Sequence, residues 1–142
     1  MITIDSNLLI YAYDQGNERH SAARQWLETV LSGVETILLA WSSIHAFLRI
    51  TTNDRIVKPA FTMEQAIGHV MSWLNQPNVR VVEPGARYWD IFLRLAREAT
   101  FKGNMVIDAH LAVLAIENNA TVCTADNDFK RFPGVRVINP LA

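Results

Sequence analysis

Three aspartates follow or lead into predicted strands, where their carboxylates can act together. Asp5 ends the β-branched run 1–5, and Asp126 lies just past the predicted strand 121–124. Asp108 lies in the first turn of the predicted helix that leads into that same strand. Carboxylates held in one cleft repel one another, and a divalent cation relieves this repulsion. Oxygen ligands without paired histidines favour Mg²⁺ or Mn²⁺ over zinc. The pattern therefore predicts phosphoryl chemistry, in which the ion orients a phosphate and activates a water.

Each acid also has an ordinary structural interpretation. Asp5 can cap the helix that follows it, and Asp108 suits the dipole of its own helix. Asp126 and Asp128 fit a turn or a helix cap. Asp108, however, lies in an otherwise apolar run, 105–109, and an unpaired buried acid is costly. The joint position of the acids is therefore a stronger indication than any one of them.

The elements that position these acids alternate between strand and helix along the whole chain. Short apolar or β-branched runs predict strands at 1–5, 36–40, 79–82, 121–124 and 135–138. Apolar residues three and four apart predict helices at 7–13, 19–31, 42–51, 63–74, 86–100 and 104–118. This order predicts an α/β protein with a short, mostly parallel sheet. Ligands of such sheets bind beyond the carboxyl ends of the strands, where the acids are expected to lie.

Length and composition limit the class of protein. The 142 residues, 50% of them apolar, predict one domain over 1–142 with a sizeable core. A net charge of −1 argues against a protein that coats nucleic acid by bulk electrostatics. With a single cysteine and no signal peptide, a reducing cytoplasm is the expected setting. The longest apolar-leaning run, 36–48, is shorter than the roughly 20 residues that a membrane span needs.

Histidines and tryptophans add no chemistry of their own at this level. The four histidines have no paired ligand spacing and are expected to be surface or packing residues. The four tryptophans lie at apolar helical positions or at the starts of elements, and are expected in the core. Helices 19–31 and 62–74 carry more apolar residues than one side of a small sheet needs, which predicts a homodimer.

Four segments carry a resemblance to a known family. They span residues 4–12, 47–56, 103–115 and 124–134. In content and order they resemble the PIN-domain endoribonucleases, and among these the VapC toxins, over the whole chain. The resemblance implies a three-layer α/β/α PIN-like fold and an endoribonuclease that depends on Mg²⁺ or Mn²⁺. It also implies a toxin of a type II toxin–antitoxin pair, usually dimeric, that a VapB-type antitoxin holds inactive.

The resemblance extends to individual residues. Asp5, Asp108 and Asp126 match the family's metal-site acids, and Asp128 matches a further acid that is often present. Four polar positions near this site are also matched, by Ser6, Asn7, Asn104 and Thr124.

One position departs from the family pattern. The family usually has a Glu on the helix after the second strand, directly before a Phe-Leu-Arg segment, and here that position holds Ala46. The site therefore has one carboxylate fewer. Both a natural branch that needs fewer acids and an engineered inactivating change are consistent with the sequence. In either case the chain is expected to have weak activity or none, unless another residue such as Asp128 substitutes.

Three functions compete at this stage. The first is an endoribonuclease toxin, with Arg49 and Lys102 as candidate RNA contacts or, alternatively, as solvated surface charges. The second is a PIN-fold binding module that engages RNA or a partner protein without cleavage, and Ala46 is its main support. The third, a phosphoacceptor signalling domain, ranks last because Asp5 has no acidic neighbour. No pattern in the chain identifies an RNA target.

Overall fold

A five-stranded parallel sheet forms the centre of the computed structural model, which describes residues 1–142. Its strands are β1 (Ile2–Ile4), β2 (Ile37–Ala40), β3 (Val79–Val82), β4 (Thr121–Cys123) and β5 (Arg136–Ile138). They pair in the order β3-β2-β1-β4-β5, and every neighbouring pair is parallel. Because β1 and β4 are neighbours, Asp5 and the segment after Cys123 leave the sheet side by side at one edge. The predicted parallel sheet is confirmed.

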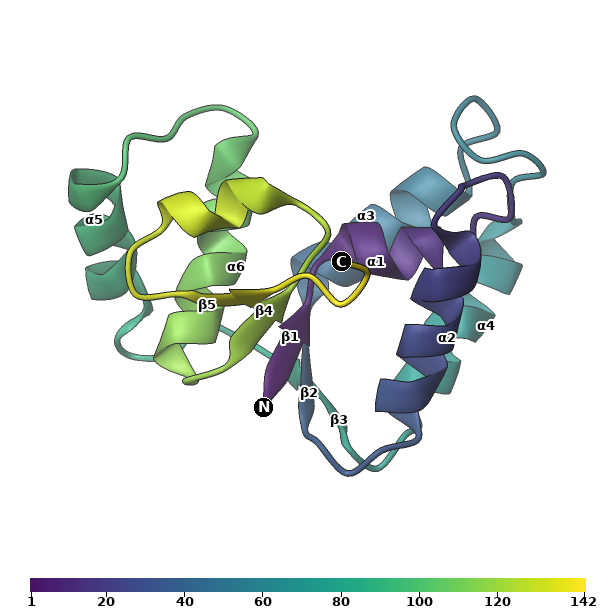
Figure 1. Ribbon diagram of the computed structural model, residues 1–142, viewed down its shortest axis with the longest axis horizontal. Coiled ribbons are helices and arrows are strands. Elements are labelled where there is room, and N and C mark those ends of the chain that lie inside the picture. The colour runs from purple at the N-terminus through teal and green to yellow at the C-terminus, as the bar shows by residue number, and fades with distance from the viewer.

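Six helices cover the two faces of the sheet. They are α1 (Ser6–Tyr11), α2 (His20–Leu31), α3 (Trp41–Thr51), α4 (Met63–Leu74), α5 (Tyr88–Glu98) and α6 (Met105–Glu117), with a 3₁₀ helix η1 (Asn127–Arg131). α1 to α4 lie on one side of the sheet, and α5, α6 and η1 lie on the other (Figure 1). All predicted helices are present, although α5 is shorter at each end than the predicted range 86–100.

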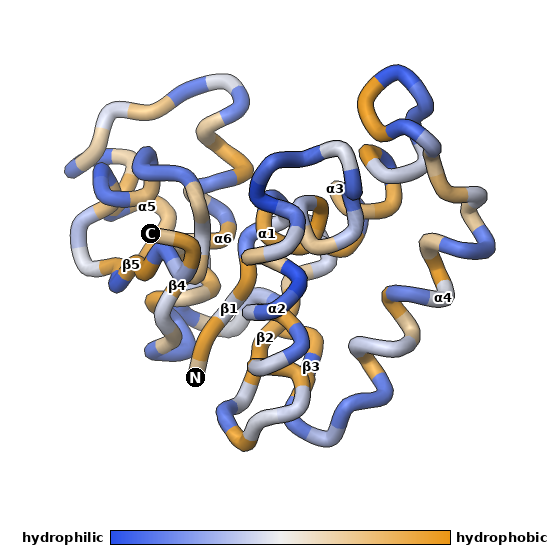
Figure 2. The backbone as a smooth tube through the Cα atoms, turned by 45° about the vertical axis from the view of Figure 1, so that its right-hand side comes forward, coloured by the Kyte–Doolittle hydropathy of each residue, from blue (hydrophilic) through white to orange (hydrophobic).

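Two hydrophobic cores form because β2 is buried on both faces. Ile37 and Leu39 pack into the core beneath α1 to α4, whereas Leu38 and Ala40 pack into the core beneath α5 and α6. Alternate side chains of a strand point to opposite faces, so an unbroken apolar strand must be covered on both. Figure 2 shows β1 and β2 as hydrophobic segments between helices of mixed polarity. The result is the predicted three-layer α/β/α arrangement.

Local sequence explains two of the helices, α4 and α6. Thr62 and Gln65 form a capping box at the start of α4, in which each residue satisfies a backbone N–H of the other. α6 is apolar on nearly all sides, and six of its residues are buried, which is typical of a helix enclosed between other elements. No helix of the structure combines the length and the apolar character that crossing a membrane requires.

The expectation that all four tryptophans lie in the core is wrong for two of them. Trp73 is 1% exposed, but Trp41 is 44% exposed and Trp89 is 59% exposed. Trp41 begins α3 and stacks on His45, and Trp89 stacks on Phe92 along the outer face of α5. Helical spacing identifies a shared face but not whether a neighbouring element covers that face.

Candidate active site

Asp5 lies between β1 and α1, and its side chain does not cap the helix that follows. It occupies the N-cap position of α1, yet its carboxylate makes no capping hydrogen bond. Its Oδ2 instead accepts a hydrogen bond of 2.8 Å from the hydroxyl of Thr124 on the neighbouring strand. Burial raises the pKa of Asp5 above its usual 3.8, against the opposing effect of the Thr124 hydrogen bond. The simple capping interpretation therefore does not account for this acid.

The hydroxyl of Thr124 connects three of the predicted site residues. Besides donating to Asp5, it accepts hydrogen bonds from the backbone N–H of Asp126 at 2.9 Å and from Nδ2 of Asn7 at 3.3 Å. Oδ1 of Asn7 in turn accepts from the backbone N–H of Ala125 at 3.4 Å. Thr124 is 1% exposed, so these bonds form in a shielded setting. They fix the start of α1 against the segment that follows β4.

Asp108 lies in the first turn of α6, half-buried, and faces the same region as the other acids. Burial, followed by the charges of Asp5, Asp126 and Asp128, raises its pKa from 3.8 to about 6, and Arg131 lowers it slightly. Asp108 and Asp5 line the same small cavity, whereas Asp126 and Asp128 do not line it. For Asp5 and Asp108, this meeting beyond the carboxyl ends of the strands matches the expectation from strand order.

Asp126 and Asp128 are partly engaged in local structure. Oδ1 of Asp126 accepts a 2.8 Å hydrogen bond from the backbone N–H of Asp128 and so caps η1. Asp128 forms an ion pair of 3.3 Å with Arg131. The cap interpretation thus holds for Asp126, and Asp128 has a local ion pair. The second carboxylate oxygen of each remains available.

Two adjoining cavities border the acids. The smaller, of about 30 Å³, has Asp5 and Asp108 in its wall with Ser6, Ser42, Ser43 and Ala46. Its volume has room for one or two water-sized particles. The larger, of about 970 Å³, shares Ser6, Ser42, Ala46, Ile107 and Asp108 with the smaller and extends past Arg49 and Asn104. Asp5 and Asp108 therefore lie beside a large cleft, and Asp126 and Asp128 line neither cavity.

The residues of this region fit a hard divalent cation in donor type and charge. Asp5 and Asp108 offer carboxylate oxygens to one small cavity. Burial is the main cause of the raised pKa of each, followed for Asp108 by the charges of the other acids, and a cation would favour the ionised form of both. No three of the chain's His, Cys, Asp and Glu side chains are grouped as a complete ligand set. Ala46 borders both cavities, at the position where the family pattern has a carboxylate. A Glu there would supply the third nearby acid.

The wall of the larger cavity contains residues that the sequence did not single out. His45, Tyr88 and His110 all line it. The hydroxyl of Tyr88 and Nδ1 of His110 are 2.6 Å apart in a hydrogen bond, and burial lowers the pKa of His110. The expectation that these histidines are only surface or packing residues is incomplete. The sequence could have indicated these histidines by their closeness to predicted site positions, since His45 precedes Ala46 and His110 follows Asp108 by two residues.

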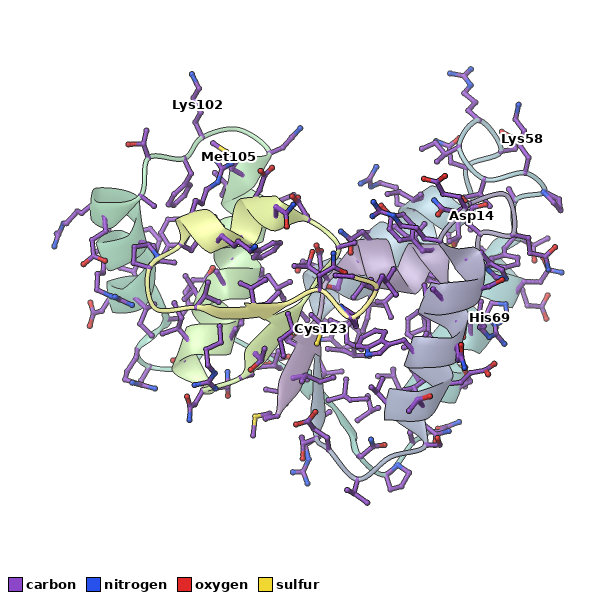
Figure 3. The ribbon with its side chains drawn as sticks, viewed as in Figure 1. Asp14, Lys58, His69, Lys102, Met105 and Cys123 are labelled. Carbon is purple, nitrogen blue, oxygen red and sulfur yellow. The ribbon has the colours of Figure 1, made fainter.

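The two candidate RNA contacts differ in position. Arg49 lines the larger cavity together with Asp108. Lys102 lies in neither cavity and extends into solvent from the loop before α6 (Figure 3).

Comparison with known proteins identifies the family. The PIN domain profile matches residues 2–135. The chain belongs to the PIN-domain family. Ribonuclease VapC37 of Mycobacterium tuberculosis is 37% identical over 142 residues, which cover 100% of this chain and 99% of that protein. Ribonuclease VapC33 of the same organism is 35% identical over 141 residues, which cover 99% of each. The resemblance to the VapC ribonucleases is thus confirmed over the full length of this PIN-domain protein.

Solved structures confirm the fold. VapBC2 from Rickettsia felis, bound to a DNA fragment from its promoter, superposes with a TM-score of 0.72 at 21% identity and covers 98% of each chain. VapC20 of M. tuberculosis, described as a toxin that cleaves the sarcin-ricin loop, has a TM-score of 0.68 at 16% identity over 96% of this chain and 99% of its own.

Proposed function

We propose that this PIN-domain protein is the toxin of a type II toxin–antitoxin pair and cleaves RNA phosphodiester bonds with Mg²⁺ or Mn²⁺. The observation that supports this most directly is that Asp5 and Asp108 share one small cavity, which adjoins a larger cleft with Arg49 in its wall. The names of the similar ribonucleases support the same reaction class. A VapB-type antitoxin is the proposed partner, because similar folds occur in VapBC structures and in a toxin–antitoxin complex from Klebsiella pneumoniae. The cytoplasm is the proposed location of the protein.

Asp5 and Asp108 are the proposed holders of the metal ion, with Asp126 and Asp128 adding negative charge beside them. When bound, such an ion orients the phosphate and makes a water molecule a better nucleophile. The hydroxyl of Thr124 keeps the Asp5 carboxylate oriented toward the cavity by its 2.8 Å hydrogen bond. Because the pKa of Asp108 is about 6, this carboxyl holds a proton in acidic solution and is ionised above neutrality. Holding the cation and adding negative charge beside it both require ionised carboxylates.

The cleft beyond the acids is the proposed path of the RNA strand. Arg49 projects into this cleft and can neutralise a phosphate next to the one that is cut. Tyr88 and Phe92 from α5 give it an aromatic wall on which an unpaired base can stack. These residues would bind and orient the strand, while the acids act on the scissile phosphate.

Ala46 gives the sharpest test of this function. Substitution Ala46→Glu places a carboxylate on a side chain that already borders both cavities. Ligands and their supporting groups contribute about 10- to 100-fold in metal affinity or activity, so RNA cleavage in Mn²⁺ should rise by about that factor. Ala22→Glu adds the same charge on the exposed face of α2 and should leave cleavage unchanged.

The assay follows a structured RNA and a DNA hairpin, each with Mn²⁺, Mg²⁺ or EDTA. Cleavage of RNA that EDTA abolishes, that Asp108→Asn eliminates and that Ala46→Glu enhances supports the proposed function. RNA binding with no cleavage, even by the Ala46→Glu variant, refutes it and favours the binding module. Full activity of the present chain with no gain from the Glu refutes the role given to position 46.

A further inference from the structure

A second cavity lies apart from the acids, on the side of the sheet covered by α1 to α4. It measures about 390 Å³ and is bounded by the connection between α1 and α2, by α2, by the loop before α4 and by α4 itself. Its aromatic and basic lining residues are Tyr13, His20, Arg24, Lys58, Phe61 and His69, and no Asp or Glu lines it. This is a positively charged hollow in a protein whose net charge is −1.

One wall of this cavity is aromatic and held rigidly. The ring of His69 lies 4.5 Å from that of Tyr13 and 4.9 Å from that of Phe61, measured between centroids. The Tyr13 hydroxyl accepts a 2.9 Å hydrogen bond from the indole N–H of Trp73. Burial, followed by the charge of Arg24, lowers the pKa of His69, so this ring is neutral at neutral pH. The wall therefore consists of uncharged rings, with those of Tyr13 and Phe61 tilted by 43° and 53° to that of His69.

The lining of the cavity also contains two cations and one free ring nitrogen. Arg24 lies 4.7 Å from the centre of the Tyr13 ring, its Nε pairs with Glu28 at 2.8 Å, and its Nη1 donates to the carbonyl oxygen of Ala12 at 3.5 Å. Nη2 is therefore the nitrogen of this guanidinium that has no protein partner. Lys58 takes part in none of the ion pairs of the structure. Nδ1 of His20 lies 2.9 Å from the carbonyl oxygen of Tyr11. Because a carbonyl only accepts, Nδ1 carries the proton, and Nε2 of the neutral ring is left as an acceptor.

We propose that this cavity binds a nucleotide, with its base against the aromatic wall and its phosphate between Arg24 and Lys58. The volume falls within the roughly 300–1,000 Å³ that is typical of small-ligand sites. Bases stack on aromatic rings regardless of sequence, and basic groups beside the rings bind the phosphate. Figure 3 shows Lys58 on the loop before α4 and His69 on α4, far from Lys102 at the start of α6.

Two sources can supply such a nucleotide. α1 separates Asp5 from Tyr13, and its six residues span roughly 9 Å, a gap that an RNA strand of a few nucleotides crosses. A nucleotide flanking the cleavage point could therefore occupy the cavity, and this source rests on the proposed function. The other source is a free mononucleotide, which does not depend on it.

The binding test uses the whole chain in EDTA, where cleavage does not interfere. Titration calorimetry measures the affinity of the protein for AMP, UMP and ribose 5-phosphate. We expect saturable binding of both nucleotides and at least tenfold weaker binding of ribose 5-phosphate, which lacks a base. Lys58→Glu should weaken nucleotide binding at least tenfold, whereas Arg80→Glu, an equal charge change on the exposed edge of β3, should not. His69→Leu should weaken the binding of AMP but not that of ribose 5-phosphate. If circular dichroism shows that His69→Leu is unfolded, Phe61→Leu serves as the variant of the aromatic wall instead.

Oligoribonucleotides of increasing length separate the two sources. If RNA supplies the nucleotide, Lys58→Glu weakens binding of long strands by a larger factor than it weakens binding of AMP. If free nucleotides are the ligand, AMP binds but strand length makes no difference to the effect of Lys58→Glu. The proposal is wrong if neither nucleotide binds, if Lys58→Glu and His69→Leu have no effect, or if only an acidic aromatic peptide occupies the cavity. Cleavage by a protein that fails this test would leave the proposed function intact.

Discussion

Replacing Asp108 with Asn should stabilise the protein in EDTA at pH 7.5. Burial and the charges of three other aspartates raise the pKa of Asp108 to about 6, compared with 3.8 in an unfolded chain. The folded state therefore holds this proton more tightly, and between these two values it binds more protons than the unfolded state does. By linkage, the free energy of unfolding falls as the pH rises from about 3.8 through about 6. Asn lacks the charge and avoids this loss.

The size of the gain follows from the shift in pKa. A rise from 3.8 to about 6, at 1.36 kcal/mol per unit, corresponds to roughly 3 kcal/mol without screening. Asp108 is only half-buried, and water screens exposed charges strongly, so about 1 kcal/mol should remain. In a domain of this length such a gain raises the Tm by about 3–4 °C.

The assay is thermal unfolding from pH 4 to pH 8 in EDTA. The parent should lose stability between pH 4 and pH 6.5, and Asp108→Asn should lose less over the same interval. Asp90→Asn is the matched control, because Asp90 also lies in the first turn of a helix but is exposed. A Tm for Asp108→Asn equal to or below that of the parent at pH 7.5, or an unchanged slope with pH, would refute the electrostatic reasoning.

Three further outcomes can be measured on the same protein. Thr124→Val should cost about 1–3 kcal/mol in urea unfolding because it leaves polar groups unpaired, whereas Thr3→Val should be neutral or stabilising because the buried Thr3 hydroxyl has no partner. Arg49→Ala should weaken RNA binding and reduce its salt slope by about 1, with no change in Tm. Light scattering at micromolar concentration should show a homodimer, since α4 exposes Met63, Ile67 and Met71, and a monomer would contradict this.

The fold was predictable because its signals are local. A run such as 36–40 is apolar at every position, and only a strand buried on both faces uses that pattern in a short element. The helices were predictable from spacing, and α4 spans the predicted range 63–74. The exposure of Trp41 and Trp89 was not predictable, because it depends on which elements cover α3 and α5 from outside.

Part of the candidate site was predictable from the sequence, and part of it was not. Asp5 and Asp126 follow adjacent strands, so topology alone brings them to one edge of the sheet. The hydrogen bond between Tyr88 and His110 joins α5 to α6, and its formation depends on how the two helices pack. No spacing within either helix contains that information. Sequence therefore located the acids but not the wall of the cleft beside them.

Residue 46 shows how the two kinds of information combine. The sequence identifies Ala46 as the position where a carboxylate is missing, but it gives no distance to the other acids. The structure places this residue in the wall of the cavity that also contains Asp5 and Asp108, so the missing side chain would have entered the site directly. With Ala at this position, the two facing carboxylates retain their raised pKa values and lack a third close acid. If Asp5 and Asp108 hold a cation as proposed, Ala46 would add no carboxylate to theirs, and Asp126 and Asp128 do not line that cavity. Weak metal binding and weak cleavage are therefore the expected behaviour of this chain.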